Sequence, residues 1–270
     1  MNANFDLNQC PLIVIWETTQ ACDLACCHCR ACAQPLRHPL ELTTKESEKL
    51  IRDVADLRPP IFILTGGDPL ILSPRRLRNV VRNLAAIDHV KIIRIHSRVP
   101  VVTPERVMRE LVRAAKAKGK ATYLVVHVNH ARELTAEVRA ACDKFIDAGI
   151  PVLSQTVLLR GVNDDEAALS DLMRALVETR IKPYYLHHAD LAPGTAHLRT
   201  TIDEGQRLMR ALRGRVSGLC QPTYVLDIPG GAGKVPIGPN YLHGKGTGGH
   251  FAVEDPSGCR HRYPPVNSPA

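Results

Sequence analysis

The chain has 270 residues, 44% of them hydrophobic and 23% charged, which is ordinary for a soluble globular protein and enough for one large α/β domain. The formal net charge is +8, but the basic residues are scattered and aromatic residues make up only 4%. This composition argues against a surface that binds nucleic acid.

The sequence shows neither a signal peptide nor a membrane span. Its opening residues lack a basic start followed by an apolar core, and no apolar run approaches the roughly 20 residues that span a bilayer. Five of the nine cysteines lie between Cys22 and Cys32, a crowding that fits a reducing compartment and a metal site better than a disulfide framework. The sequence therefore predicts a cytoplasmic protein.

The first chemical motif is a cysteine-rich segment that follows an apolar, strand-like run at residues 11–16. Cys22, Cys26 and Cys29 have C-x3-C-x2-C spacing. Three thiolates on one loop can bind three irons of a 4Fe–4S cluster and leave the fourth iron open to a small molecule. A zinc site or plain thiols are the alternatives, since Cys29 and Cys32 also form a C-x2-C pair. The remaining cysteines are isolated in the sequence, which favours the cluster.

Beyond the cysteines, strand and helix patterns alternate. Apolar runs predict strands, and apolar positions three to four residues apart predict helices. Thr43 or Thr44 is the expected N-cap of the first helix. The expected strands cover residues 60–65, 91–95, 121–128, 151–159 and 181–186, and the expected helices cover residues 42–57, 74–86, 104–118, 134–148, 164–179 and 201–213.

Six such strand–helix units predict an α/β fold, an incomplete (β/α)6 barrel with parallel strands and a site at their carboxyl ends. A doubly wound open sheet is the alternative, although its Gly-x-Gly-x-x-Gly fingerprint is absent. Residues 222–226 fit one more strand, and residues 241–270 are expected to form loops or partial disorder. The expected division is a partial barrel over residues 1–215 and a loop-rich C-terminal part over residues 216–270.

Two glycine-rich segments could approach a ligand closely. Gly66 and Gly67 follow the second strand, and Asp68 after them could accept a hydrogen bond from an ammonium group, although the segment also fits an ordinary turn. Residues 229–234 read Pro-Gly-Gly-Ala-Gly-Lys, which departs from a phosphate loop because Val235 follows Lys234. Lys234 is either a Schiff-base amine or a solvated loop lysine.

The cysteine triplet resembles the signature of radical S-adenosylmethionine (SAM) enzymes, and the chain is similar to that superfamily over most of its length. The resemblance implies a radical SAM barrel with a 4Fe–4S cluster, bound SAM and an external electron donor. SAM would be cleaved to a 5′-deoxyadenosyl radical that takes hydrogen from the substrate. Gly66, Gly67 and Asp68 match the Gly-Gly-Glu-like segment that binds the methionyl amino group, with Asp in place of Glu.

From residue 64 to about 241 the chain resembles the lysine 2,3-aminomutase family. The matching stretches lie at residues 94–102, 127–130, 155–164, 182–185, 194–199 and 222–234. In that family the lysine of the Pro-Gly-Gly loop links covalently to pyridoxal 5′-phosphate (PLP), which implies this role for Lys234. Asp190 and Asp227 match the aspartates that hold the distal ammonium of substrate lysine, although both would otherwise be loop-capping acids.

Three further residues match family positions that contact SAM. They are His28, His127 and Gln155. Each would otherwise be a satisfied polar residue of the core or of a loop.

The first 60 or so residues resemble a different radical SAM branch, whose members modify peptides or haem precursors. Aminomutases carry a phosphate-binding arginine ahead of their cysteines, and no arginine precedes Arg30 here. Their carboxylate-binding arginine corresponds to Ala31, and their C-terminal zinc cysteines have only Cys259 as a counterpart.

The sequence therefore predicts a radical SAM, PLP-dependent L-lysine 2,3-aminomutase, an isomerase that shifts an amino group to give β-lysine. The expected partners are lysine or a related amino acid and an electron donor, without a membrane or nucleic acid; a homo-oligomer is compatible with the sequence. The alternatives are a PLP-independent radical SAM enzyme that modifies a peptide or tetrapyrrole, and a non-catalytic Fe–S protein.

Overall fold

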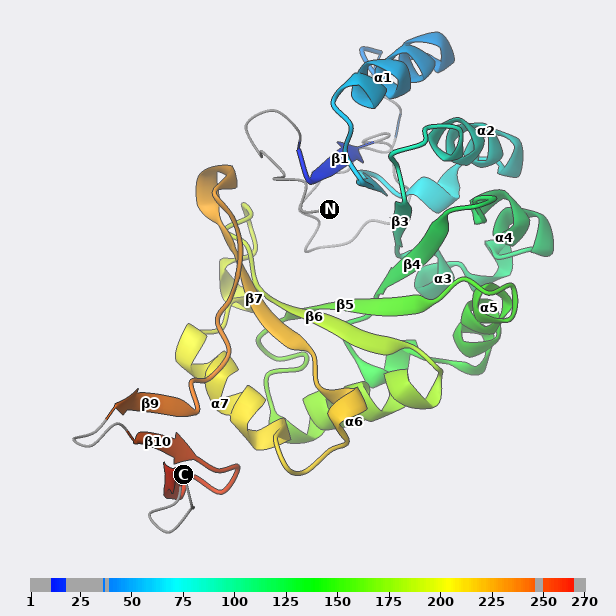
Figure 1. Ribbon diagram of the computed structural model, residues 1–270. Helices are drawn as coiled ribbons and strands as arrows, with labels where there is room; N and C mark the ends of the chain where they lie inside the picture. The colour runs from blue at the N-terminus through cyan, green and yellow to red at the C-terminus, as the bar shows by residue number, and fades with distance from the viewer. Residues whose placement is uncertain (1–10, 18–35, 37–38, 246–249, 265–270) are drawn as a thin grey trace.

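A computed structural model describes residues 11–17, 36, 39–245 and 250–264. Eight strands form one sheet in sequential order from β1 to β8. The seven parallel strands are β1 (Ile13–Glu17), β2 (Ile61–Thr65), β3 (Ile92–Ser97), β4 (Ala121–His127), β5 (Val152–Leu158), β6 (Lys182–His188) and β7 (Thr223–Ile228), and β8 (Gly233–Pro236) is antiparallel to β7. The sheet curls into a half-barrel (Figure 1). The expected α/β partial barrel with six strand–helix units is confirmed, and β7 is the additional strand expected near residues 222–226.

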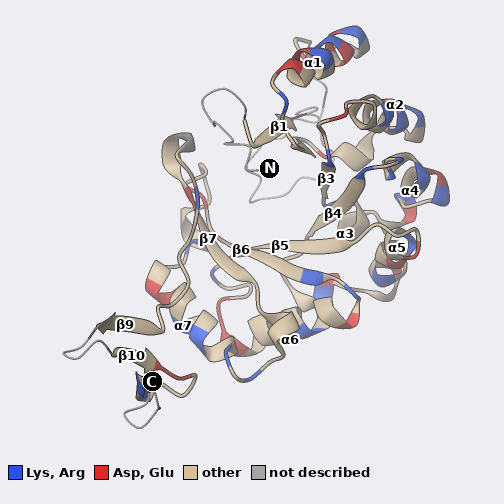
Figure 2. Cartoon of the chain, viewed as in Figure 1, with Lys and Arg blue, Asp and Glu red and all other residues tan. Residues whose placement is uncertain are grey.

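The helices cover the convex face of the curled sheet (Figure 1). They are α1 (Thr44–Asp56), α2 (Pro74–Ala85), α3 (Val99–Val102), α4 (Arg109–Ala115), α5 (Ala136–Asp147), α6 (Glu166–Glu178) and α7 (Ile202–Leu212). Thr43 caps α1 in a capping box, since its hydroxyl accepts from Glu46 N at 3.3 Å and Glu46 Oε2 accepts from Thr43 N at 2.7 Å. Charged side chains lie mainly on the helices, whereas the strands carry few (Figure 2).

Alternation along the strands separates the two faces of the sheet. In β3, Ile93 and Ile95 are buried, while Arg94 and His96, which alternate with them, lie on the opposite face and are partly exposed. The buried residues belong to one apolar core that also includes Leu77 of α2. The half-barrel thus has an apolar outer layer under its helices and an inner face that can take polar residues.

The expected helix over residues 104–118 is shorter in the structure. A 3-10 turn at Pro104–Arg106 precedes it, and α4 covers only Arg109–Ala115. Val107 between them is fully buried, and its carbonyl accepts from Lys144 Nζ of α5 at 2.7 Å. Tertiary packing at Val107 therefore overrides the helical period.

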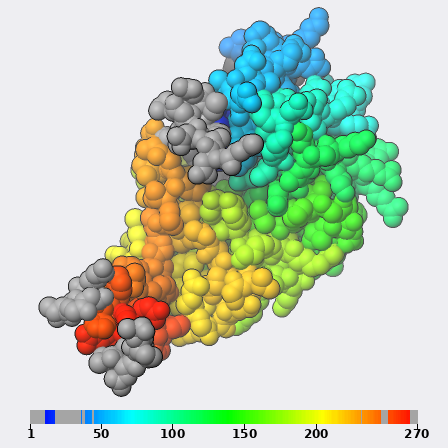
Figure 3. All heavy atoms as spheres, viewed as in Figure 1, coloured from blue at the N-terminus to red at the C-terminus, as the bar shows by residue number. Residues whose placement is uncertain are grey.

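The C-terminal part also differs from the expectation of loops or disorder. Three short antiparallel strands form a second sheet, β9 (Leu242–Lys245), β10 (Phe251–Glu254) and β11 (Arg260–Tyr263). Glu254 of β10 accepts from Arg210 of α7 and contacts His243 of β9. In Figure 3 these strands pack beside the chain around α7. The expectation was wrong for these three strands, because strands of this length carry too little alternation to be recognised in sequence, and residues 246–249 and 265–270 lie outside the described residues.

Among the residues that the structure describes, no helix has the length and apolar character needed to span a membrane.

Candidate active site

The inner face of the half-barrel carries a row of polar side chains. His127 of β4 lies opposite Gln155 of β5, which lies opposite Tyr185 of β6. A closed barrel normally fills its interior with branched apolar side chains. The row also includes Arg94, His96, His187, Asp227 and Lys234, which come from β3, β6, β7 and β8. This polar interior marks the inner face as the candidate ligand site.

The glycine-rich segment after β2 lies at the carboxyl edge of the sheet, as predicted. Gly66 has φ 104°, a conformation that favours glycine. Thr65 before it pairs with Glu17, the last residue of β1. The segment that begins after Glu17 contains Cys22, Cys26, Cys29 and His28, which lie outside the described residues.

Asp68 is only 3% exposed and accepts four hydrogen bonds from the chain itself. Burial raises the pKa of Asp68, and the four donors oppose that shift. A carboxylate has about four lone-pair sites, so these bonds match its acceptor capacity. The donors are Ser97 Oγ (2.7 Å) and Leu70 N (2.9 Å) to Oδ1, and Arg98 N (2.6 Å) and Val99 N (3.2 Å) to Oδ2. Asp68 therefore ties the loop after β2 to the turn after β3.

Two histidines of the row meet on neighbouring strands. The rings of His96 and His127 are 6.1 Å apart in an edge-to-face arrangement. Arg94 lies 3.0 Å from His96 Nε2 and stacks 5.6 Å from the centre of the Tyr184 ring. Burial, followed by the charges of His127 and Arg94, holds the pKa of His96 well below its usual range. His96 is therefore a neutral imidazole at physiological pH.

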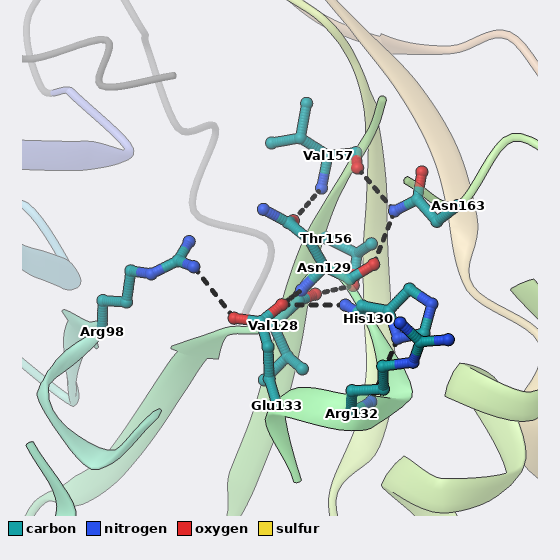
Figure 4. Close-up of polar contacts among 9 residues, drawn as sticks. All are labelled: Arg98, Val128, Asn129, His130, Arg132, Glu133, Thr156, Val157 and Asn163. Atoms are coloured by element: carbon teal, nitrogen blue, oxygen red, sulfur yellow. Dashed lines mark hydrogen bonds and ion pairs between the residues drawn. The ribbon is translucent and has the colours of Figure 1, made fainter. Parts of the chain in front are cut away.

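A buried polar network fixes the ends of β4 and β5 (Figure 4). Asn129 Oδ1 accepts from Val157 N at 2.9 Å, and Asn163 Nδ2 donates to Asn129 O at 2.8 Å. Glu133 accepts from Asn129 N at 2.7 Å and from Arg98 at 2.9 Å. These bonds position the strand ends that follow His127 and Gln155. The sequence alone predicts no role for these residues, although Asn129 and Asn163 fall in the matching stretches at residues 127–130 and 155–164.

The Pro-Gly-Gly segment is the turn of a hairpin. Gly230 has φ 80°, and β8 then runs back along β7 so that Lys234 lies directly opposite Asp227. Lys234 Nζ lies 2.6 Å from Asp227 Oδ1 and 2.5 Å from Oδ2. The hairpin therefore makes Lys234 and Asp227, seven residues apart in sequence, an ion pair.

His187 of β6 completes this group. Its Nδ1 donates to Asp227 Oδ2 at 3.1 Å and lies 3.3 Å from Lys234 Nζ. The hydrogen bond from His187 and the ammonium of Lys234 hold the pKa of Asp227 far below its usual range, whereas burial lowers the pKa of His187. Lys234 Nζ also lies 5.4 Å from the centre of the Tyr185 ring.

Asp190 lies two residues beyond β6, and its charge acts on both His187 and His188. The structure thus brings Asp190 and Asp227 to the same histidine. Sequence reasoning missed Tyr185, His187 and Arg94 as residues of the inner face. The strand period alone could have placed Arg94 and His96 on one face.

Comparison with known proteins shows the superfamily to which the chain belongs. The family model of the radical SAM superfamily matches residues 16–173, and the model described as lysine-2,3-aminomutase matches residues 209–248. L-lysine 2,3-aminomutase of Acetoanaerobium sticklandii is 40% identical over 85% of this chain and 55% of its own length. The enzyme of the same name from Clostridium subterminale is 41% identical over 85% of this chain and 55% of its own length.

The chain therefore spans about half the length of the curated relatives that it matches. A radical SAM methyltransferase from Sphaerobacter thermophilus shares the fold with a TM-score of 0.61 at 18% identity, covering 79% of this chain and 66% of that one. Native anSMEcpe with bound AdoMet has a TM-score of 0.56 at 9% identity, covering 74% of this chain and 58% of that one. This chain belongs to the radical SAM superfamily and is similar to L-lysine 2,3-aminomutases.

Proposed function

We propose that this chain is an isomerase, a radical SAM, PLP-dependent aminomutase that moves the α-amino group of L-lysine to the neighbouring carbon and gives β-lysine. The observation that carries this proposal is Lys234, held against Asp227 and His187 on the inner face of the half-barrel. A lysine at such a position can bond covalently to an aldehyde cofactor. The names of the relatives support lysine as the substrate.

The residues of the inner face fit PLP. Lys234 supplies the amine, and the tilted rings of Tyr184 and Tyr185, with centroids 3.9 Å apart, offer an aromatic surface beside it. Arg94 lies on this face 3.0 Å from His96 Nε2, and its positive charge favours an anionic group such as phosphate. Arg94 is thus our candidate for the arginine that binds the phosphate group of PLP.

We propose that Cys22, Cys26 and Cys29 hold a 4Fe–4S cluster. Gly66 and Gly67 would approach SAM through their backbone, with Asp68 ordering the loop. Bound SAM, reduced through the cluster by an external electron donor, supplies the radical that takes hydrogen from the substrate. The remaining SAM contacts are assigned to His28, His127 and Gln155.

Asp190 and Asp227 would hold the distal ammonium of lysine. A buried carboxylate is favourable only where a cation meets it, and Asp227 already has a low pKa that keeps it ionised. We keep the proposed division of the chain into a partial barrel over residues 1–215 and a C-terminal part with Lys234 over residues 216–270. Strands β7 and β8 of the second part extend the sheet of the first.

The test is product analysis under anaerobic conditions. Protein with a reconstituted cluster is given SAM, a reductant, PLP and L-lysine, and β-lysine is sought by mass spectrometry. We expect β-lysine from the wild type and none from Cys26→Ala or Lys234→Ala. SAM cleavage without β-lysine, with or without PLP, would instead favour a PLP-independent enzyme acting on a peptide or tetrapyrrole. Absence of SAM cleavage in protein with an intact cluster would favour the non-catalytic Fe–S protein.

A further inference from the structure

Asp227 already binds a cation that belongs to the chain. Both of its carboxylate oxygens lie within 2.6 Å of Lys234 Nζ, which faces it across the β7–β8 hairpin. The side chains of Lys234 and Asp227 are 29% and 20% exposed, so the pair is accessible from solvent. A small cation arriving from solvent would therefore meet a carboxylate that is already neutralised.

This arrangement conflicts with a simple role for Asp227 in substrate binding. A carboxylate paired through both oxygens with one ammonium presents no net charge to a second one. Two ammonium groups on the same carboxylate would also repel each other at close range. Lys234 and an incoming ammonium therefore exclude each other at Asp227.

We propose that Asp227 is a shared cation site, occupied either by Lys234 or by the distal ammonium of an amino-acid substrate. The inference rests on the proposed function, because Lys234 gives up its charge when it bonds to an aldehyde cofactor. Lys234 loses one proton to solvent, its neutral nitrogen bonds to the aldehyde carbon, and one water leaves. Asp227 keeps its negative charge, and the substrate ammonium can take the place of the Lys234 ammonium.

The surroundings of Asp227 support the exchange. His187 comes from β6, a strand other than the one that carries Lys234, and its Nδ1 lies 3.1 Å from Asp227 Oδ2. Asp190, beyond the end of β6, adds a second negative charge near His187, and Tyr185 is the neighbouring phenol. The carboxylate is therefore held in place after Lys234 withdraws. The cofactor must bond to Lys234 before the substrate ammonium binds tightly.

The experiment uses cofactor-free protein and 6-aminohexanoate, which has the distal ammonium and the carboxylate of lysine but no α-amino group. Calorimetry compares its dissociation constant for the wild type and for Lys234→Met, which removes the charge and keeps the length. We expect at least about tenfold tighter binding to Lys234→Met, because the ammonium of Lys234 no longer competes for the carboxylate. Lys234→Arg, which keeps the charge, should bind like the wild type.

Two controls identify the site. Hexanoate, which lacks the ammonium, should bind Lys234→Met no better than it binds the wild type. Adding Asp227→Asn to Lys234→Met should remove the gain. Equal affinity of the wild type and Lys234→Met for 6-aminohexanoate would overturn the inference.

A second measurement covers the case in which Lys234→Met does not fold. Acetylation of Lys234 is followed by peptide mass mapping in the wild type and in Asp227→Asn. We expect Lys234 to react several-fold faster in Asp227→Asn, since no carboxylate holds its ammonium, and an unchanged rate would contradict the inference. Both measurements are made without PLP, so their outcomes do not depend on whether the protein has the proposed aminomutase activity.

Discussion

Asp68 and Asp227 both lie beside glycine-rich turns, and the sequence suggested an ammonium ligand for each. Asp68 is 3% exposed and accepts four hydrogen bonds, three of them from backbone N–H groups. Asp227 is more exposed, and its contacts include the side chains of His187 and Lys234. Backbone donors cannot leave without unfolding the loop, whereas a lysine can withdraw. The difference separates a carboxylate that builds the site from one that can exchange its partner.

The largest effect should come from Asp68→Ala. Its loss removes the acceptor of Ser97 Oγ, Leu70 N and Arg98 N, whereas Val99 N keeps the Ser97 hydroxyl at 3.1 Å. At about 1–3 kcal/mol for each buried donor that loses its acceptor, we expect the unfolding free energy to fall by about 3 kcal/mol or more. Urea unfolding followed by circular dichroism measures it. Asp143→Ala, which removes a surface partner of Arg180, is the matched control and should cost less than about 1 kcal/mol. Similar losses of unfolding free energy in both variants would show that Asp68 does not hold the site together more than a surface carboxylate does.

Gly205→Ala tests the support of β7 from the helical side. A Cβ at Gly205 of α7 would lie 2.2 Å from the hydroxyl of Tyr224, which contacts His188 Nδ1 at 2.8 Å. We expect a loss of about 1–3 kcal/mol from overpacking. Gly218→Ala is the control, because a Cβ there meets nothing within 4 Å. A thermal unfolding midpoint that falls equally in both variants would show that the Tyr224 contact is unimportant.

Asp227→Asn should cost only about 1 kcal/mol at neutral pH, since the ion pair is partly exposed. The pKa of Asp227 is lower in the folded than in the unfolded chain, so its contribution is present above about pH 4 and is lost as the pH falls further. The stability difference between wild type and Asp227→Asn should therefore shrink below about pH 4. A difference that stays constant down to about pH 2 would show that the charge of Asp227 is not what stabilises the hairpin.

The smallest effect concerns His96. Its pKa is lower in the folded chain, so the neutral ring stabilises the fold above the usual value of about 6.5, and that stability is lost as the pH falls below it. The unfolding free energy of the wild type should fall by about 0.7 kcal/mol more than that of His96→Gln when the pH is lowered from about 7 to about 6. Chemical denaturation at the two pH values measures it. Identical pH dependence in wild type and His96→Gln would mean that the ring titrates normally.

Much of the fold follows from sequence period, but the site does not. Apolar runs located β2 to β6, and Thr43 was a recognisable cap, because these signals are local. The pairing of Asp227 with Lys234 depends on the register of a hairpin whose turn looked like a loop. His187 joins them from a strand 40 residues earlier, a contact that no local pattern encodes.

Lys234 is the residue that we propose bonds covalently to PLP. Borohydride reduction of the protein with PLP under anaerobic conditions, followed by peptide mass mapping, tests it most directly. We expect a reduced adduct on the peptide that contains Lys234, and none there in Lys234→Ala. Absence of an adduct at Lys234, in protein whose cluster still cleaves SAM, would contradict it.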